Sequence, residues 1–350
     1  MNRVEEEAFF LSAVAELYGK QPQDLHALRR NNPNWKRLYR VDHVSEPSWV
    51  LRAYHRSFVG DWLFSWFSRY SSLFEWLQTR ASILMYLTRQ DYPAPLVIPT
   101  QAGAWIGVYQ EWYMLVTTFV EGDAKETTPE KMQALGASLG CLHTISLPEA
   151  SSTTECVGVS WWDYVTGIRD ALDRLDSAAE ALPAEWQEAH AAFLQTFHTF
   201  QQHPYLPTTL IHGDCWAENG IRTQGECATL IDWECAGLGI AIADLGSLLL
   251  HCHFDQIDNI DVAEYHPDPQ RIAAVVRGYC RWRSPGAEEL AVLLEAIRFS
   301  IAWRGALWCQ SGAMYGWNEW PQQRLTRWWC WYAISEEIAH IARACIEQWL

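Results

Sequence analysis

The sequence has few basic residues and no long run of apolar residues. Its 350 residues include 26 Lys or Arg and 42 Asp or Glu, so the formal net charge is −16 at pH 7. A surface that binds nucleic-acid phosphates must be basic, and we therefore expect no nucleic-acid partner. A helix that crosses a bilayer needs about 18 consecutive apolar residues. Because the sequence contains no such run, we expect no membrane partner.

Closely spaced cysteines are also lacking. The ten cysteines occur singly, without a Cys-x-x-Cys pair. Disulfide frameworks and structural zinc sites use cysteines at short, regular spacings, so we expect reduced thiols and no zinc site. Three glutamates at 5–7 occupy positions where a secretory signal would be basic. These features predict a cytoplasmic protein.

The composition predicts a globular chain of more than one domain. Apolar residues make up 49% of the sequence, which excludes disorder, and 350 residues suit two domains better than one. Residues 1–121 contain equal numbers of basic and acidic residues, so residues 122–350 carry the whole net charge. The acidic residues are either a solvated surface or a field that favours a cationic substrate.

The spacing of apolar residues predicts a β-rich first part and a mostly helical second part. Strands are expected at 38–41, 49–54, 114–120, 220–222 and 228–231. Helices are expected at 4–18, 73–87 and 132–142, with several more within 161–202 and 287–349.

Aromatic residues and one histidine pair allow two interpretations each. The 21 tryptophans cluster at 62–76 and 303–331, where they either pack in the core or form the walls of a ligand site. His251 and His253 are interpreted as a packed or solvated pair rather than metal ligands. The acidic residues at 255–264 form either a solvated face or a lip for an ammonium-bearing substrate.

Side chains that could bind a metal or take part in catalysis are concentrated within 210–245. His212, Gly213 and Asp214 follow an apolar pair, Asn219 lies five residues beyond Asp214, and Asp232 ends a predicted strand. These side chains converge when a tight loop and a hairpin fold together. Mg²⁺ prefers hard oxygen ligands, usually one or two carboxylates together with substrate phosphates. The remaining carboxylate can orient an attacking hydroxyl or accept its proton.

Three motifs in this order resemble those of the aminoglycoside phosphotransferase and choline kinase family, which is related to the protein kinases. They are HGDxxxxN at 212–219, IDWE at 231–234 and Asp244-Leu245. The resemblance covers about residues 30–335. It implies an α+β, bilobal protein-kinase-like fold. Residues 1–121 would form a small β-rich nucleotide-binding lobe with its hinge, and residues 122–350 a larger, mostly helical lobe with the catalytic loop and the substrate site.

The resemblance also implies roles for the residues of the second lobe. Asp214 would be the catalytic base that positions the substrate hydroxyl. Asn219 and Asp232 would hold Mg²⁺ between the phosphates of ATP. His212 and Asp244 would support the loop structurally.

Further residues of the nucleotide site are implied in the first lobe. Arg52 takes the place of the lysine that contacts the α and β phosphates, and backbone groups near Thr118, Phe119 and Val120 would meet the adenine. Glu234, in the second lobe, is an acidic residue near the site with no assigned role.

The sequence departs from the family pattern at two places. Arg80 stands where a helix glutamate would hold the phosphate-binding lysine. Two arginines cannot pair, so both face phosphate, or Arg80 meets a carboxylate such as Glu75 or Asp232, or the alignment of this helix is shifted. The expected phosphate loop, 30–34, contains no glycine, although asparagine tolerates left-handed backbone.

The resemblance implies an ATP-dependent phosphotransferase that moves the γ-phosphoryl group to a hydroxyl of a small molecule, with Mg²⁺. The acceptor would be an amino sugar, an amino alcohol or a similar compound that could be cationic, although a neutral sugar or a macrolide fits nearly as well. The alternative is a nucleotide-binding regulatory protein with a kinase-like fold and weak or no turnover. The oligomeric state is left open.

Overall fold

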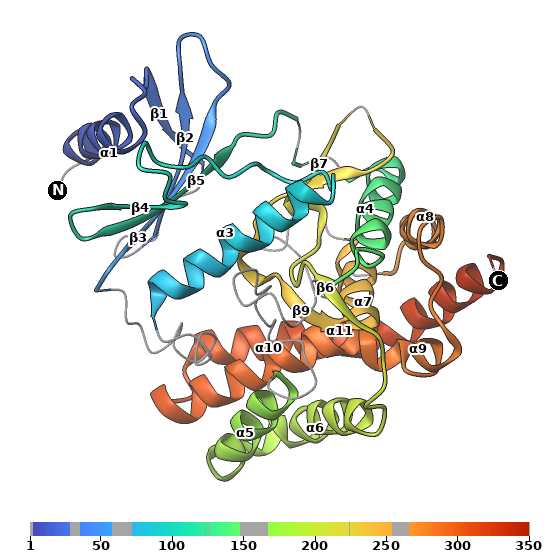
Figure 1. Cartoon of the computed structure of the whole chain (residues 1–350). Coiled ribbons are helices and arrows are strands. Elements are labelled where there is room, and N and C mark those ends of the chain that lie inside the picture. The colour runs from blue at the N-terminus through green and yellow to red at the C-terminus, as the bar shows by residue number, and fades with distance from the viewer. Residues whose placement is uncertain are drawn as a thin grey trace. The chain divides into compact units, whose positions relative to one another are not determined.

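The computed structural model describes residues 3–28, 36–57, 72–122, 124–125, 127–147, 167–223, 225–253 and 266–349. These residues divide into two compact units, one up to Glu121 and the other from Gly122 onward (Figure 1). The predicted phosphate loop at 30–34 and the acidic residues at 255–264 lie outside the described residues, as do Trp62 and Trp66.

A five-stranded antiparallel sheet forms the centre of the first unit, with strand order β1-β2-β3-β5-β4. Its elements are α1 (Arg3–Tyr18), β1 (Asp24–Ala27), β2 (Lys36–Asp42), β3 (Trp49–His55), α3 (Leu73–Arg89), β4 (Ile106–Tyr109) and β5 (Trp112–Thr118). The predicted helices and strands of this part are confirmed, with small shifts of their ends. The strand expected at 114–120 ends at Thr118, although the N–H of Phe119 still donates to the carbonyl of Ser48, the next pair in the register of β3 and β5.

Helix α1 covers one face of this sheet. The core between them consists of side chains from α1 and from β1, β2, β3 and β5, including Phe10, Ala13, Val14, Leu25, Tyr39, Val41, Leu51, Ala53 and Val116. Phe10 also meets Trp112 edge to face, with ring centroids 5.2 Å apart. Burial of these rings, rather than helix propensity, fixes α1 on the sheet.

Helix α3 lies against the other face. Its first turn is capped by Ser72, whose hydroxyl accepts a hydrogen bond from the N–H of Glu75. Trp76 of α3 meets Tyr54 of β3 edge to face, with ring centroids 5.6 Å apart. Because side chains alternate along a strand, Arg52 lies on the same face of the sheet as Tyr54, and therefore on the side of α3.

The second unit is mostly helical and includes two small antiparallel sheets, β6–β9 and β7–β8. The helices are α4 (Pro129–Leu142), α5 (Gly167–Ala178), α6 (Gln187–Gln201), α7 (Ala241–His251), α8 (Pro269–Cys280), α9 (Ala287–Ala291), α10 (Leu293–Tyr315) and α11 (Glu319–Glu347). The strands are β6 (Thr208–Ile211), β7 (Gly220–Arg222), β8 (Ala228–Leu230) and β9 (Gly237–Ile240). Single 3₁₀ turns are η1 (Ala179–Ala181), η2 (Ala184–Trp186), η3 (Ala217–Asn219) and η4 (Trp233–Cys235).

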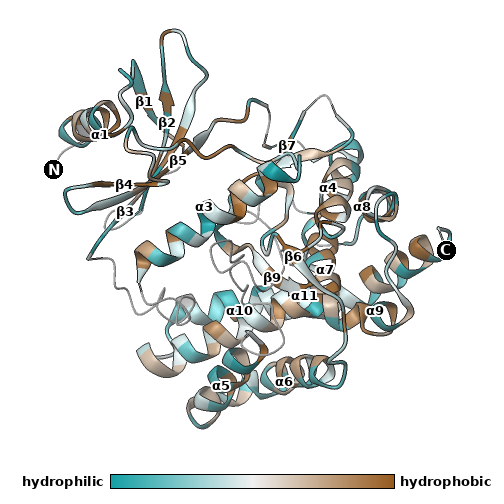
Figure 2. Cartoon of the chain, viewed as in Figure 1, coloured by the Kyte–Doolittle hydropathy of each residue, from teal (hydrophilic) through white to brown (hydrophobic). Residues whose placement is uncertain are grey.

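Helix α7 is the buried centre of this unit. Every residue from Ala241 to His251 is buried, and the helix is drawn mainly in brown in Figure 2. It packs closely on α10, because a Cβ atom at Gly246 would lie 2.3 Å from the backbone of Ala296. Larger side chains would push the two helices apart, so the close packing fixes α10 relative to α7.

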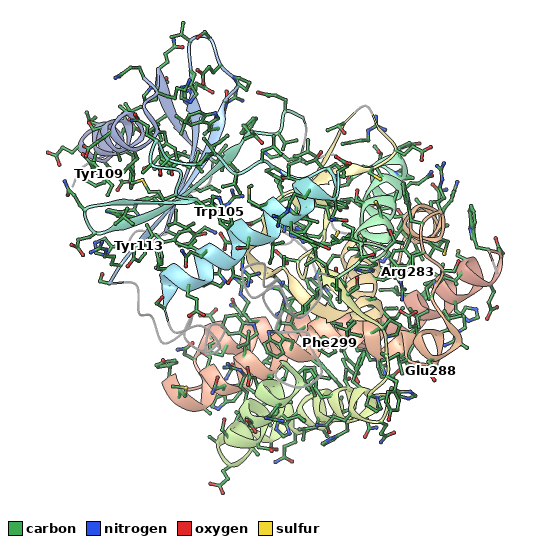
Figure 3. The ribbon with its side chains drawn as sticks, viewed as in Figure 1. Trp105, Tyr109, Tyr113, Arg283, Glu288 and Phe299 are labelled. Carbon is green, nitrogen blue, oxygen red and sulfur yellow. The ribbon has the colours of Figure 1, made fainter. Side chains whose placement is uncertain are left out.

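The remaining aromatic side chains of this unit mostly fill its core. Phe299 of α10, labelled in Figure 3, meets the rings of Phe197 and Phe200 edge to face. Trp303 and Trp331 are almost fully buried. Core packing is therefore confirmed for these tryptophans. None of the helices within the described ranges is long and apolar enough to cross a membrane.

The predicted α+β fold class is confirmed, with a β-rich first unit and a mostly helical second unit. The strands expected at 220–222 and 228–231 are present as β7 and β8. The region 287–349 contains three helices, and its long helices α10 and α11 are separated at Gly316, which has a φ of 90°. Strands β1, β4, β6 and β9 were not predicted.

Candidate active site

The loop that begins at His212 is held by a carboxylate from the first turn of α7. Oδ2 of Asp244 accepts a hydrogen bond from the N–H of His212 at 2.9 Å, and Oδ1 accepts one from the N–H of Gly213 at 3.0 Å. Asp244 is fully buried, so these donors satisfy a charge that would otherwise be costly. This is the geometry that a supporting role for Asp244 requires.

The backbone at position 213 explains why the first motif contains a glycine. Its φ is 75°, and a Cβ atom at this position would lie 2.5 Å from the carbonyl oxygen of Cys235. Glycine adopts the left-handed region without steric cost, whereas another residue would strain the backbone and collide with the turn after β8. The sharp bend at Gly213 leads the chain from the buried strand β6 to Asp214.

His212 ties the loop to the end of β8. Its ring is fully buried, its Nε2 lies 2.9 Å from the carbonyl oxygen of Ile231, and it meets the Trp233 ring edge to face with centroids 4.7 Å apart. Because a carbonyl only accepts, His212 donates this hydrogen bond from Nε2. The bond keeps the loop beside Asp232, the next residue after Ile231.

Asp214 and Asn219 are brought into direct contact. The side-chain nitrogen of Asn219 donates to the backbone carbonyl of Asp214 at 2.8 Å and to its Oδ2 at 2.9 Å. Asn219 is 3% exposed, whereas the side chain of Asp214 is 27% exposed and accessible to a substrate. Since the amide nitrogen is engaged, the amide oxygen of Asn219 is the atom left to face a cation.

Asp232 lies on the neighbouring turn in an unusual backbone conformation. Its φ is 62° and its ψ is 58°, in the left-handed region that Asp tolerates better than most residues. The N–H of Ile231 donates to the carbonyl of Asn219 at 2.8 Å, which connects the two segments directly. Because Asp232 directly follows Ile231, and Asn219 also bonds Asp214, the structure brings the predicted residues Asp214, Asn219 and Asp232 together.

The environment of Asp214 is electrostatically mixed. Removal from bulk water raises the pKa of this carboxyl, the guanidinium of Arg304 lowers it, and Asp232 raises it further, with a net upward shift. Arg304 of α10 donates from Nη2 to Oδ1 of Asp214 at 3.3 Å. The sequence prediction did not include Arg304, because it lies 90 residues from Asp214.

The site could hold a divalent cation with oxygen ligands. The amide oxygen of Asn219 and the carboxylate of Asp232 are hard donors of the kind that Mg²⁺ and Ca²⁺ take. Within the described ranges, no group of three or more His, Cys, Asp or Glu residues is gathered as a metal site. A cation held by these two residues would therefore need further oxygens, such as those of phosphates and water.

A buried chain of hydrogen bonds extends from Asp244 to α8 and α9. His143 lies with Nε2 3.2 Å from Oδ2 of Asp244 and with Nδ1 2.8 Å from the hydroxyl of Tyr279. Arg283 donates to the same hydroxyl at 2.9 Å and to both carboxylate oxygens of Glu289, also at 2.9 Å. Arg283 lies between α8 and α9 and is labelled in Figure 3.

The donors in this chain have one consistent direction. Since Arg283 can only donate, the Tyr279 hydroxyl accepts from it and donates to Nδ1 of His143, which in turn donates from Nε2 to Asp244. Burial lowers the pKa of His143, although the nearby Asp244 carboxylate opposes the shift. We conclude that His143 is neutral and that α4, α7, α8 and α9 together hold the loop that begins at His212.

In the first unit, Arg52 of β3 and Arg80 of α3 lie on the same side of the sheet. Nη1 of Arg52 donates to the hydroxyl of Thr117 at 3.4 Å. Arg80 is 4% exposed on the inward face of α3, as its helical spacing predicted, and its guanidinium lies over the ring of Trp76 at 5.7 Å.

The predicted adenine-binding segment keeps part of its hydrogen-bonding capacity. The N–H of Thr118 donates to the carbonyl of Leu96 and the N–H of Phe119 to that of Ser48, both at 2.9 Å. A ligand would therefore have to meet the N–H of Val120 or the carbonyl groups of this segment. Glu234 lies in η4, half-buried, and has no assigned role.

Comparisons with known proteins identify the class to which this fold and site belong, the protein-kinase-like phosphotransferases. The chain belongs to the phosphotransferase enzyme family, whose sequence model matches residues 34–308. The family resemblance and the predicted enzyme class are thereby confirmed. No match was found among curated protein sequences.

Solved structures share this fold at low sequence identity. An amicoumacin kinase in complex with AMP-PNP, Ca²⁺ and Ami has a TM-score of 0.64 and 15% identity, covering 97% of this chain and 96% of that one. A spectinomycin phosphotransferase in complex with ADP and spectinomycin has a TM-score of 0.57 and 16% identity, covering 98% and 99%. A choline kinase from Cryptosporidium parvum Iowa II has a TM-score of 0.57 and 15% identity, covering 90% and 91%.

Proposed function

We propose that this protein transfers the γ-phosphoryl group of ATP to a hydroxyl group of a small molecule. The observation that carries the proposal is the contact of Asp214 with Asn219 on a loop that Asp244 anchors, next to Asp232, whose neighbour Ile231 bonds Asn219. Family membership supports phosphoryl transfer, and the similar structures in complex with AMP-PNP or ADP support ATP as the co-substrate.

In the proposed reaction, Asp214 accepts a hydrogen bond from the acceptor hydroxyl and aligns its oxygen with the γ-phosphorus. As the new O–P bond forms and the bond to the bridging oxygen of ATP breaks, Asp214 takes the proton and ADP leaves. Asn219 and Asp232 would hold Mg²⁺, which offsets the charge of the phosphates when bound. Arg52 would contact the α and β phosphates, and the backbone near Thr118, Phe119 and Val120 would bind adenine.

The substrate class proposed from the sequence is a hydroxylated small molecule such as an amino alcohol or an amino sugar. The spectinomycin phosphotransferase and the choline kinase of similar fold support this class. Nucleotide binding is assigned to residues 1–121 and substrate binding to residues 122–350. These assignments, and the cytoplasmic location, stay predictions.

The first prediction concerns Asp214. We expect Asp214→Asn to lower kcat by about 10²- to 10⁴-fold, the usual contribution of general base catalysis. Binding of AMP-PNP should persist, since the variant keeps the shape of the side chain and its contact with Asn219. ATP consumption would be measured with a panel of hydroxylated compounds, with and without Mg²⁺, and AMP-PNP binding by calorimetry. Asp173→Asn, on the exposed face of α5, is the matched control.

The alternative function makes a different prediction in the same experiment. A regulatory protein would bind the nucleotide but consume no ATP with any acceptor, and Asp214→Asn would then change nothing. The buried Arg80, in place of the helix glutamate, is the observation that favours this alternative. Full turnover by Asp214→Asn would contradict the proposed role of Asp214.

A further inference from the structure

Arg304 is held beside Asp214 by rigid parts of the second unit. It lies on α10, which packs tightly on α7, and α7 carries the Asp244 carboxylate that anchors the loop of Asp214. The guanidinium carbon of Arg304 lies 5.1 Å from the centroid of the Trp328 ring on α11. The distance between Arg304 and Asp214 is thus set by helix packing rather than by a flexible surface contact.

The ring under the guanidinium is itself fixed in place. Trp328 meets Trp331 edge to face with ring centroids 4.5 Å apart, and His251 of α7 lies against both rings. Stacking on such a ring orients the planar guanidinium and reduces the conformational freedom that it loses when it binds a ligand.

The guanidinium keeps unused hydrogen-bonding capacity. Arginine has five N–H donors, and among the residues that the structure describes the hydrogen bond to Oδ1 of Asp214 is the one that Arg304 donates. Its side chain is 30% exposed. The remaining donors can therefore bind a ligand that comes up to Asp214.

An acceptor hydroxyl must reach Asp214 next to this cation. Each carboxylate oxygen of Asp214 already accepts one hydrogen bond, Oδ2 from Asn219 and Oδ1 from Arg304, and each can accept another. A positive group close to the hydroxyl would be repelled by Arg304, whereas an oxyanion would form a charge-assisted pair with the guanidinium fork.

We infer that Arg304, supported by Trp328, forms an acceptor subsite for an oxyanion group, a carboxylate or a phosphate, next to the hydroxyl that receives the phosphoryl group. The inference rests on the proposed role of Asp214 and narrows the proposed class of hydroxylated small molecules to those that also bear an oxyanion. The subsite would therefore be positively charged, although residues 122–350 as a whole are acidic. A hydroxy acid, including one that also bears an amine, satisfies this subsite, and a simple amino alcohol does not.

Calorimetric binding with AMP-PNP and Mg²⁺ present tests the subsite independently of turnover. The probes are pairs that differ by the oxyanion: L-serine and ethanolamine, L-homoserine and 3-aminopropan-1-ol, glucose 6-phosphate and glucose. We expect the oxyanion member of at least one pair to bind at least tenfold more tightly to the wild type. The carboxylate and phosphate pairs distinguish the two sources of the oxyanion. Arg304→Gln should remove that preference, and Arg304→Lys should restore part of it.

Arg298→Gln is the matched control, because Arg298 lies on the same helix, pairs with Glu336 and stacks on Tyr332, away from Asp214. It should keep the preference, and thermal unfolding confirms that all variants are folded. Three results would overturn the inference: tighter binding of the members without an oxyanion, no binding of any probe, or an equal loss of affinity for both members of a pair in Arg304→Gln. Oxyanion binding that depends on Arg304 without any turnover would overturn the proposed transfer reaction but leave the subsite intact.

Discussion

Gly213 illustrates how a single residue determines the geometry of the site. Its left-handed φ and the carbonyl oxygen of Cys235, 2.5 Å from where a Cβ would lie, leave no space for a side chain. The same residue donates its N–H to Asp244, so any shift of its backbone weakens the anchor of the loop. The residue beside it is the proposed catalytic base.

We therefore expect Gly213→Ala to lower both stability and activity. The left-handed conformation costs a residue with a Cβ roughly 1–2 kcal/mol, and the contact with Cys235 adds to this. Activity per folded molecule should fall at least about tenfold, because small displacements of a base are costly. Thermal unfolding and kcat would be compared with Gly225→Ala. A Cβ at Gly225 would meet ordinary contacts near 4 Å, so this control should be tolerated. A fully active, fully stable Gly213→Ala would contradict this account of the loop.

At the scale of elements, the loop that carries Asp214 depends on side chains from several helices. Asp244 on α7 bonds the loop, His143 from the end of α4 bonds Asp244, and Tyr279 on α8 bonds His143. Helices α4 and α8 can form this chain because their backbones approach closely at Gly278, where a Cβ would lie 1.9 Å from the carbonyl oxygen of Gln133. The packing of small residues thus brings three polar side chains into one buried network.

Tyr279→Phe should separate positioning from binding. It removes the hydroxyl between Arg283 and His143, which leaves two buried polar groups with one hydrogen bond fewer, at a cost of about 1–3 kcal/mol. We expect kcat to fall while KM for ATP changes little, since the nucleotide contacts are not altered. Tyr332→Phe provides the control: its buried hydroxyl bonds Thr196 and Ala192 on α6, so it should cost stability without lowering kcat. Equal kcat in both variants would count against a positioning role for Tyr279.

At the scale of the whole molecule, buried histidines connect stability to pH. Burial, with the nearby charge of Arg304, lowers the pKa of His251 to about 3, and burial lowers that of His253 to about 4. In the unfolded chain both have pKa values of about 6.5. Below pH 6.5 the unfolded chain binds more protons than the native protein. These two histidines therefore make the free energy of unfolding fall as the pH is lowered.

For His251 alone, linkage predicts a loss of about 1.4 kcal/mol between pH 7.5 and 5.5. Urea unfolding at these two pH values should show this loss in the wild type. His251→Gln should lack this part of the loss, since it removes the titrating group. His198→Gln, on the exposed face of α6, should retain it. An unchanged pH dependence in His251→Gln would mean that other groups cause the acid sensitivity.

The sequence by itself determined the part of the site whose residues lie close together along the chain. The motif from His212 to Asn219 and the hairpin that ends before Asp232 span few residues, so a short loop and a local turn suffice to bring them together. Helical spacing alone also predicted that Arg80 faces inward. Spacing along an element determines which face a side chain occupies, because the geometry of helices and strands is regular.

Tertiary structure alone decided which distant side chains join that local site. Arg304 meets Asp214 across 90 residues, and Tyr279 meets His143 across 136, because α10 packs on α7 and α8 packs on α4. The short edge strands β1 and β4, four residues each, also depend on their partners more than on their own pattern. Helix and sheet packing depends on side-chain shape over the whole unit. A local sequence pattern therefore does not predict that Arg304 lies beside Asp214, or that His143 and Tyr279 support its loop.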